Sequence, residues 1–106
     1  MYSLNKGTST RSITMKTDLK ELAYAYAMLS HPTRLGVLQA LASGPKSIAY
    51  LLKTLRQTPN TLGKHLRLLR MSRLVTGAYR GREVFYQADT AALKMLGDAI
   101  AGMVGK

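Results

Sequence analysis

The segment Thr58–Leu69, TPNTLGKHLRLL, decides the fold that we expect for this chain. Thr58 can cap a helix with its hydroxyl group, and Pro59 suits the first helical position, where its missing N–H would have no partner anyway. At about 100° per residue, three leucines fall on one side of such a helix: Leu62, Leu66 and Leu69. The segment therefore predicts an amphipathic helix that runs to about Met71 and is anchored to a core by its leucines.

The opposite side of this helix is polar. Its residues are Asn60, Gly63, Lys64 and Arg67. Lysine and arginine donate to guanine or to phosphate, and asparagine pairs with adenine, so we expect this side to enter the major groove of DNA. Gly63 costs about 1 kcal/mol of helix propensity relative to alanine, and it either permits close approach to a duplex or is merely tolerated. We include Thr58 and Thr61 in the DNA-binding set, with helix capping as the first role of Thr58.

A second helix is expected directly before this one. Ser47 can cap it, and its expected inward residues are Ile48, Leu51, Leu52 and Leu55. Only Arg56 and Gln57 connect it to the helix that Thr58 caps. Such a pair suggests a helix-turn-helix, although any helical hairpin shows the same pattern.

Two more helices are expected nearer the N-terminus. One begins at Pro32, ends before Gly44-Pro45, and is expected to bury Leu35, Leu38 and Leu41. The other runs from about Asp18 to Ser30 with Asp18 or Thr17 as its cap, and its apolar stripe comprises Leu19, Leu22, Tyr26 and Leu29. We expect residues 1–16 to be a flexible arm.

The sequence changes period after the DNA-facing helix. We expect strands at Leu74–Tyr79 and Glu83–Gln87, joined by a tight turn in which Gly81 supplies the positive φ. A basic hairpin directly after a helix-turn-helix is a wing, and the combination is more specific than either part. We expect Arg80 and Arg82 at its tip to grip phosphate or to enter a minor groove; a solvated turn is the alternative.

The net charge of +11 is concentrated in the middle of the chain. No Asp or Glu occurs from Leu22 to Arg82, a stretch that carries ten Lys and Arg, whereas the remainder sums to +1. A folded cationic surface without acidic residues attracts a polyanion, so nucleic acid is the leading partner. The alternative is a basic face that serves only solubility. An anionic membrane is disfavoured, because the basic and apolar residues are not sorted onto one long amphipathic helix.

Composition excludes several classes of protein. The chain has 106 residues, the length of one domain, and no cysteine, which excludes disulfides, thiolate metal sites and cysteine nucleophiles. The absence of a long apolar run and of an apolar N-terminal segment predicts no membrane span and no secretory signal, and hence a cytoplasmic protein. The sequence contains no paired carboxylates, no Ser/His/Asp set and no phosphate loop, so it gives no indication of an enzyme.

Three motifs resemble those of ArsR/SmtB-type winged-helix repressors. The stretch LSHPTRL at 29–35 resembles the opening of their second helix, TPNTLGKHLRLL resembles their recognition helix, and Leu74-Val75 with GREVFY at 81–86 resembles their wing. The resemblance covers about residues 18 to 100. It implies a homodimeric DNA-binding repressor whose first and last helices form the dimer interface.

The residues agree with a homodimer. A last helix is expected to begin at Asp89 or Thr90, and its apolar stripe matches that of the first helix. A chain this short is not expected to bury both stripes by itself. The expected interface is Leu19, Leu22, Tyr26, Leu93, Leu96, Ile100 and Met103. The predicted architecture is thus mainly α with a small β-hairpin (α+β): a winged helix-turn-helix of five helices and a two-stranded wing, occupying residues 17–106. Two-fold symmetry predicts a palindromic operator in double-stranded DNA.

Three departures from the family pattern carry expectations. His31 replaces an aspartate, which we expect to remove a good N-cap. Arg73 replaces a glycine at a left-handed position, at a cost of about 1 kcal/mol, and Gly63 replaces a serine that commonly contacts DNA. This last change bears on base preference, not on DNA binding.

We expect no metal cofactor and no metal sensing. The helix after Ser47 offers no ligand, the last helix has no histidine, and His65 is expected to pack or to contact phosphate. A small-molecule or protein effector is left open. The alternatives to a repressor are an activator that displaces another DNA-bound protein, and a winged-helix module that binds protein or RNA.

Overall fold

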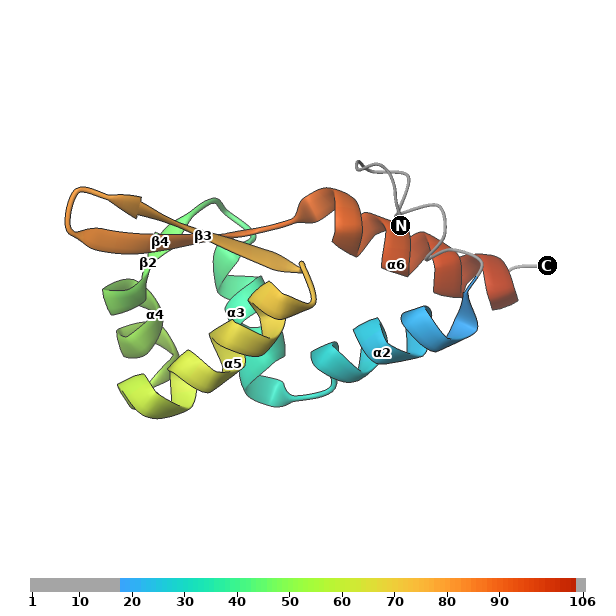
Figure 1. Cartoon of the computed structure of the whole chain (residues 1–106), viewed down its shortest axis with the longest axis horizontal. Coiled ribbons are helices and arrows are strands. Elements are labelled where there is room, and N and C mark those ends of the chain that lie inside the picture. The colour runs from blue at the N-terminus through green and yellow to red at the C-terminus, as the bar shows by residue number, and fades with distance from the viewer. Residues whose placement is uncertain (1–17, 105–106) are drawn as a thin grey trace. The chain divides into compact units, whose positions relative to one another are not determined.

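The computed structural model describes residues 18–104 (Figure 1). Its elements, in chain order, are α2 (Leu19–Leu29), α3 (Pro32–Leu41), β2 (Lys46–Ser47), α4 (Ile48–Leu55), α5 (Pro59–Met71), β3 (Val75–Arg80), β4 (Glu83–Ala88) and α6 (Thr90–Val104). They divide into two compact units, which within the described residues are 28–90 and 18–27 with 91–104. The expected arm at residues 1–16 lies outside the described residues.

Local chemistry sets where the helices begin. Asp18 Oδ1 accepts from the backbone N–H of Lys20 at 2.9 Å, and Ser47 Oγ accepts from that of Tyr50 at 3.1 Å. Each bond satisfies one of the N–H groups that the first turn of a helix leaves without a partner. The five expected helices are confirmed, and α4 and α5 form the expected helix-turn-helix.

His31 caps α3, so the expectation that it removes the cap was wrong. Its Nδ1 accepts from the backbone N–H of Thr33 at 3.0 Å, and its backbone is extended, with φ −158° and ψ 133°. Pro32 explains this conformation, because the residue before a proline is driven out of the helical region. A neutral imidazole nitrogen is a competent acceptor, so the cap survives without a carboxylate.

The wing hairpin is confirmed, and the sheet that contains it has one strand more than expected. β3 pairs antiparallel with β4, and Arg80 lies opposite Glu83 across a turn in which Gly81 has φ +65°. The short β2 pairs with the other edge of β4, giving the order β2-β4-β3. Arg73 has φ +64°, as expected for its left-handed position, and Arg56, at the end of α4, also has a positive φ of +54°.

The core of the 28–90 unit is built on leucines from three helices and the first residues of the wing. Its buried members are Val37, Leu41, Leu51, Leu62, Leu66, Leu69, Leu74 and Val75. Leu35 was expected inside but is 52% exposed, and Val37 occupies the interior instead. The apolar residues of α3 are distributed around all sides of the helix, so its sequence does not show which side faces the core. On α4 only Leu51 is fully buried; the other three expected inward residues are half-buried.

The second unit holds α2 and α6. Leu22, Ala25 and Leu96 are buried in it, and the hydroxyl of Tyr26 donates to the backbone carbonyl of Leu96 at 2.7 Å. Leu22 and Leu96 therefore belong to the interior of a single chain, which the apolar stripes alone could not distinguish from a surface facing a second copy. No helix in residues 18–104 combines the length and apolar composition needed to cross a bilayer.

Candidate nucleic-acid interface

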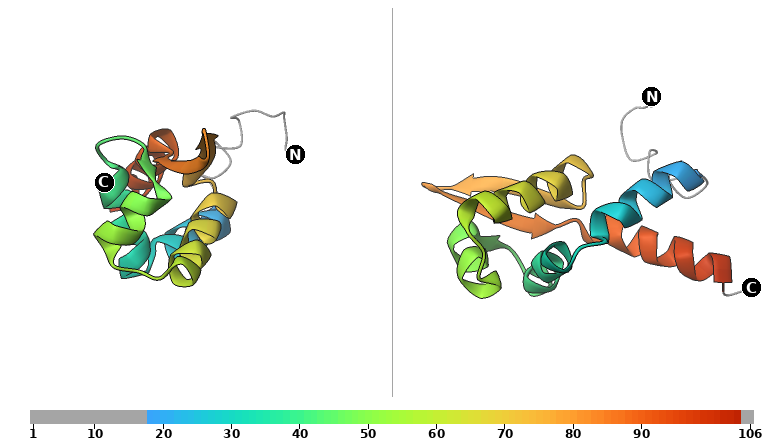
Figure 2. Two further views of the ribbon diagram at one scale, coloured as in Figure 1. Left: turned by 90° about the vertical axis from the view of Figure 1, so that its left-hand side faces the viewer. Right: turned by 90° about the horizontal axis from the view of Figure 1, so that it is seen from below.

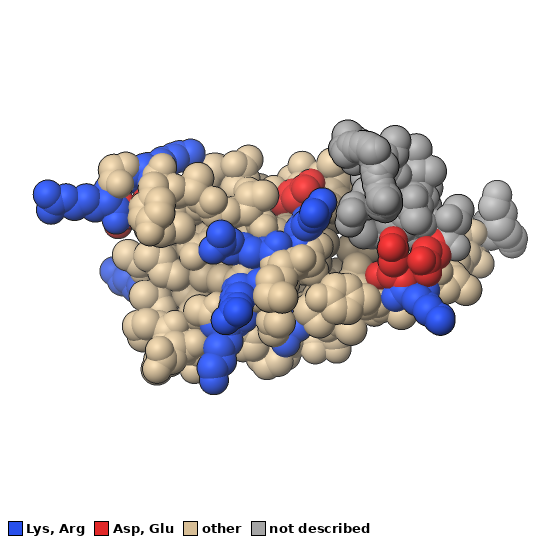
Figure 3. Space-filling model, in the orientation of Figure 1, with Lys and Arg blue, Asp and Glu red and all other residues tan. Residues whose placement is uncertain are grey.

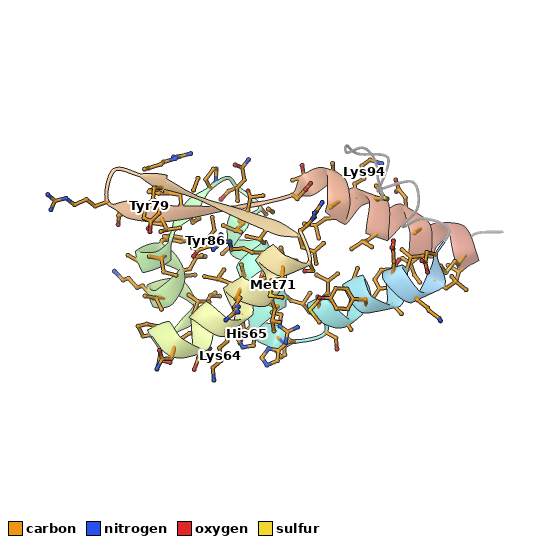
Figure 4. All side chains as sticks on the ribbon, in the orientation of Figure 1. Lys64, His65, Met71, Tyr79, Tyr86 and Lys94 are labelled. Atoms are coloured by element: carbon orange, nitrogen blue, oxygen red, sulfur yellow. The ribbon has the colours of Figure 1, made fainter. Side chains whose placement is uncertain are left out.

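The two sides of α5 have opposite environments. Its three anchoring leucines are buried, whereas Asn60, Gly63, Lys64 and Arg67 are all exposed. Lys64 points away from the body of the unit in Figure 4. A Cβ at Gly63 would meet no atom within 4 Å, so this glycine leaves the outer face flat without relieving any crowding inside the chain. The face can therefore be approached closely by a large ligand.

Thr58 caps the N-terminal end of α5 and contacts Thr61. Thr58 Oγ1 accepts from the backbone N–H of Thr61 at 3.2 Å and donates to Thr61 Oγ1 at 3.0 Å. Thr58 is thus occupied as the cap that the sequence predicted. Thr61 is exposed and accepts from Thr58, so its own hydroxyl proton can be donated outward.

The wing places two further cations on the same unit. Arg80 and Arg82 are exposed, and the hairpin that carries them extends past the N-terminal end of α5 (Figures 1 and 2). The guanidinium of Arg80 lies 4.7 Å from the centre of the Phe85 ring, a cation–π contact that limits its motion. Arg82 occupies the turn itself. At the basic tip, Arg80 is therefore held against the Phe85 ring, and Arg82 lies in the turn.

The charge of this unit is one-sided. Residues 28–90 contain ten Lys and Arg but only two carboxylates, Glu83 and Asp89. Figure 3 shows Lys and Arg side chains over α5 and at the end of the hairpin. Lys53, Arg56, Arg70 and Arg73 are exposed as well, in addition to the cations that the sequence predicted to contact DNA. A surface of this kind attracts phosphate from a distance.

His65 ties α5 to α3 rather than facing outward. Its Nδ1 accepts from Arg34 Nε at 3.2 Å, its ring centre is 4.3 Å from that of His31, and Arg34 also donates to the carbonyl of Met28 at 3.0 Å. Burial lowers the pKa of His65 below 6.5, and His31 and Arg34 lower it further. Of the two roles considered for His65, the structure supports packing.

Acid is therefore expected to destabilise this unit. An unfolded histidine has a pKa of about 6.5, so below that pH the unfolded chain binds more protons at His65 than the folded chain does. The stabilising contribution is complete above about pH 6.5 and is lost as the pH falls toward the lower folded pKa. Urea unfolding between about pH 8 and pH 5 should show a decline in the free energy of unfolding. The decline should be smaller in His65→Gln, whose amide oxygen accepts the Arg34 bond without titrating; equal slopes would contradict the assignment.

The described residues contain no group of three or more His, Cys, Asp or Glu side chains close enough to hold a metal ion. The two histidines that do meet, His31 and His65, each use Nδ1 as an acceptor within the chain. The pair is accounted for by helix capping and packing.

Comparisons with known proteins agree with this arrangement. Residues 29–78 match the family model of a helix-turn-helix domain. An ArsR-like transcriptional regulator from Rhodococcus sp. RHA1 is 31% identical, with 82% of this chain and 81% of that chain covered and a TM-score of 0.71. HlyU from Vibrio cholerae N16961 is 22% identical, covering 87% and 100% with a TM-score of 0.68. NolR from Sinorhizobium fredii is 21% identical, covering 94% and 97% with a TM-score of 0.67.

The similarities to HlyU and NolR show a common fold. The similarity to the ArsR-like regulator also extends to the amino-acid sequence over most of both chains. No curated protein sequence matches the chain significantly.

Proposed function

This chain belongs to the ArsR-like family of transcriptional regulators, and from that premise we propose that it is a dimeric repressor that binds a palindromic operator. The α5 helix of each copy enters a major groove, and the two major grooves are successive along the duplex. The observation that carries the proposal is the exposed row of Asn60, Lys64 and Arg67 on a helix whose other side is locked into the core.

Each part of the surface has its own task in this proposal. Lys64 and Arg67 donate to guanine or phosphate, and Asn60 pairs with adenine. Thr61 donates to phosphate near the helix start, and Arg80 and Arg82 bind the backbone or the minor groove with little regard for sequence. Gly63 permits the backbone of α5 to approach the base edges.

Dimerisation is proposed through α2 and α6. Several large apolar side chains of these helices are exposed: Leu19, Tyr24, Ile100, Met103 and Val104. Tyr26 and Leu93 are half-buried and complete the rim, while Leu22 and Leu96 support it from inside. A second copy covers such a face and sets two α5 helices at the fixed separation that a palindrome requires.

Regulation by cysteine-bound metal or by thiol oxidation has no place in this proposal, because the sequence contains no cysteine. As a regulator of chromosomal DNA, the protein acts in the cytoplasm.

The test is selection of bound sites from fragmented genomic DNA by the purified chain. We expect enrichment of one palindrome with half-sites about one helical turn apart, preferred over random duplex by about 10³-fold or more. Operator placement over promoters, with transcription reduced in vitro, supports a repressor, whereas increased transcription supports the activator alternative. Equal binding of operator and random duplex would contradict the proposal and favour a module for protein or RNA.

A further inference from the structure

The space above Gly77 is shared by side chains from α5 and β4. A Cβ on Gly77 would lie 3.0 Å from Cε1 of Tyr86 and 3.6 Å from Nε of Arg70. Gly77 has no positive φ, so space rather than backbone conformation explains the glycine. Its missing side chain allows the Tyr86 ring and the Arg70 guanidinium to lie over the strand.

Arg70 occupies the edge of the exposed side of α5 that adjoins the wing. At about 100° per residue, Arg67 and Lys64 lie roughly 140° and 200° from Leu62, and Arg70 lies roughly 80° from it. Arg70 is exposed, and the ion pair found within residues 18–104, between Lys94 and Asp98, does not involve it. Its charge is available to a ligand that covers α5.

Tyr79 continues this row toward the tip of the hairpin. Alternate residues of a strand share a face, so Tyr79 lies on the same side as Gly77, opposite Val84 on the neighbouring strand. Its side chain is 76% exposed, the largest exposure of any aromatic residue in the described part of the chain. Figure 4 shows Tyr86 nearer to α5 and Tyr79 nearer to the tip. The row therefore runs from Arg70 across Gly77 and Tyr86 to Tyr79.

We propose that this row, with Arg70 and Tyr79 as its contacts, holds the phosphodiester strand that separates the major groove under α5 from the minor groove next to it. A duplex that receives a helix in one groove and a hairpin tip in the next must pass one backbone strand between them. Arg70 binds a phosphate of that strand through its guanidinium, and Tyr79 donates its hydroxyl to another. This inference rests on the proposed function and adds two residues to it.

The test compares Arg70→Gln and Tyr79→Phe with matched controls at exposed positions outside this row, Lys94→Gln on α6 and Tyr50→Phe on α4. Affinity for the selected operator and for random duplex is measured by fluorescence anisotropy at several salt concentrations. Arg70→Gln is expected to weaken both complexes equally, by about tenfold per α5 helix, or about a hundredfold per dimer. It should also reduce the slope of log K against log salt by about 0.9 per arginine, or about 1.8 per dimer. Tyr79→Phe is expected to weaken both complexes several-fold with little change of slope, and the controls to change neither.

The results separate this inference from the proposed function. If the wild-type chain prefers its operator and Lys64→Ala weakens that preference, but Arg70→Gln and Tyr79→Phe bind like the wild type, the backbone contacts are wrong and the proposed function stands. A changed operator-to-random ratio in Arg70→Gln would also overturn the inference, because it would make Arg70 a base contact. If the wild type shows no preference for an operator, the proposed function has failed. Circular dichroism melting of each variant establishes that the exposed substitutions leave the fold intact.

Discussion

Replacing Lys64 and Arg67 together with alanine is expected to remove operator recognition while leaving the fold intact. Both side chains are exposed on α5, opposite leucines that are fully buried, so their loss creates no cavity. Each base contact contributes about 1–3 kcal/mol of discrimination. The double variant should therefore lose about 2–6 kcal/mol of operator affinity per α5 helix if the two contributions are independent.

The decisive measurement is the ratio of operator affinity to random-duplex affinity. A matched control, Lys20→Ala with Lys94→Ala, removes the same charge from exposed positions on α2 and α6. We expect the control to retain the ratio, because uniform loss of charge affects both duplexes alike. An unchanged ratio in the Lys64 and Arg67 variant would show that another surface distinguishes the bases.

Much of the fold is predictable because helix starts depend on nearby atoms. Ser47, Thr58 and Pro59 mark helix starts in the sequence, and the structure begins α4 and α5 directly after the two capping residues. His31 shows the limit of reasoning from residue preferences. The extended backbone that Pro32 imposes counts for more than the absence of a carboxylate, so the imidazole takes the capping role.

Features that depend on distant segments were not predictable in the same way. The two-residue strand β2 exists because Lys46 and Ser47 meet Tyr86 and Phe85, some forty residues away in the chain. Arg70 was omitted from the predicted DNA surface because the helix alone does not show which of its edges adjoins the wing. The contact with Gly77 requires the register of β3 against β4, and no periodicity in α5 carries that information.

The apolar stripes of the first and last helices pose a related problem. The spacing shows that Leu22 and Leu96 lie on the apolar stripes of their helices. It does not show whether the same chain or a second copy covers them. The structure buries both within one chain, at 1% and 2% exposure. A charge at Leu96 would therefore test folding rather than assembly.

The second large effect is expected from the apolar residues of α6 that remain exposed. Ile100 and Met103 are about half exposed and lie within about 40° of Leu96 around the helix. If a second copy covers them, Ile100→Glu with Met103→Glu places four carboxylates in one apolar interface, which costs several kcal/mol without partners. The variant is expected to sediment as a monomer at concentrations where the wild type is a dimer.

Loss of the dimer should weaken operator binding more than any single DNA contact does. A monomer engages one half-site, so it forgoes the effective concentration that a linked second half-site supplies, a factor of about 10² or more. The matched control is Ala91→Glu with Ala101→Glu, which adds the same charge at exposed positions on the other side of α6. Because added negative charge repels DNA in both variants, only the difference between them measures assembly. A dimer that persists in the Ile100 and Met103 variant would remove α6 from the interface, and the spacing of the two α5 helices would then have to be set by another surface.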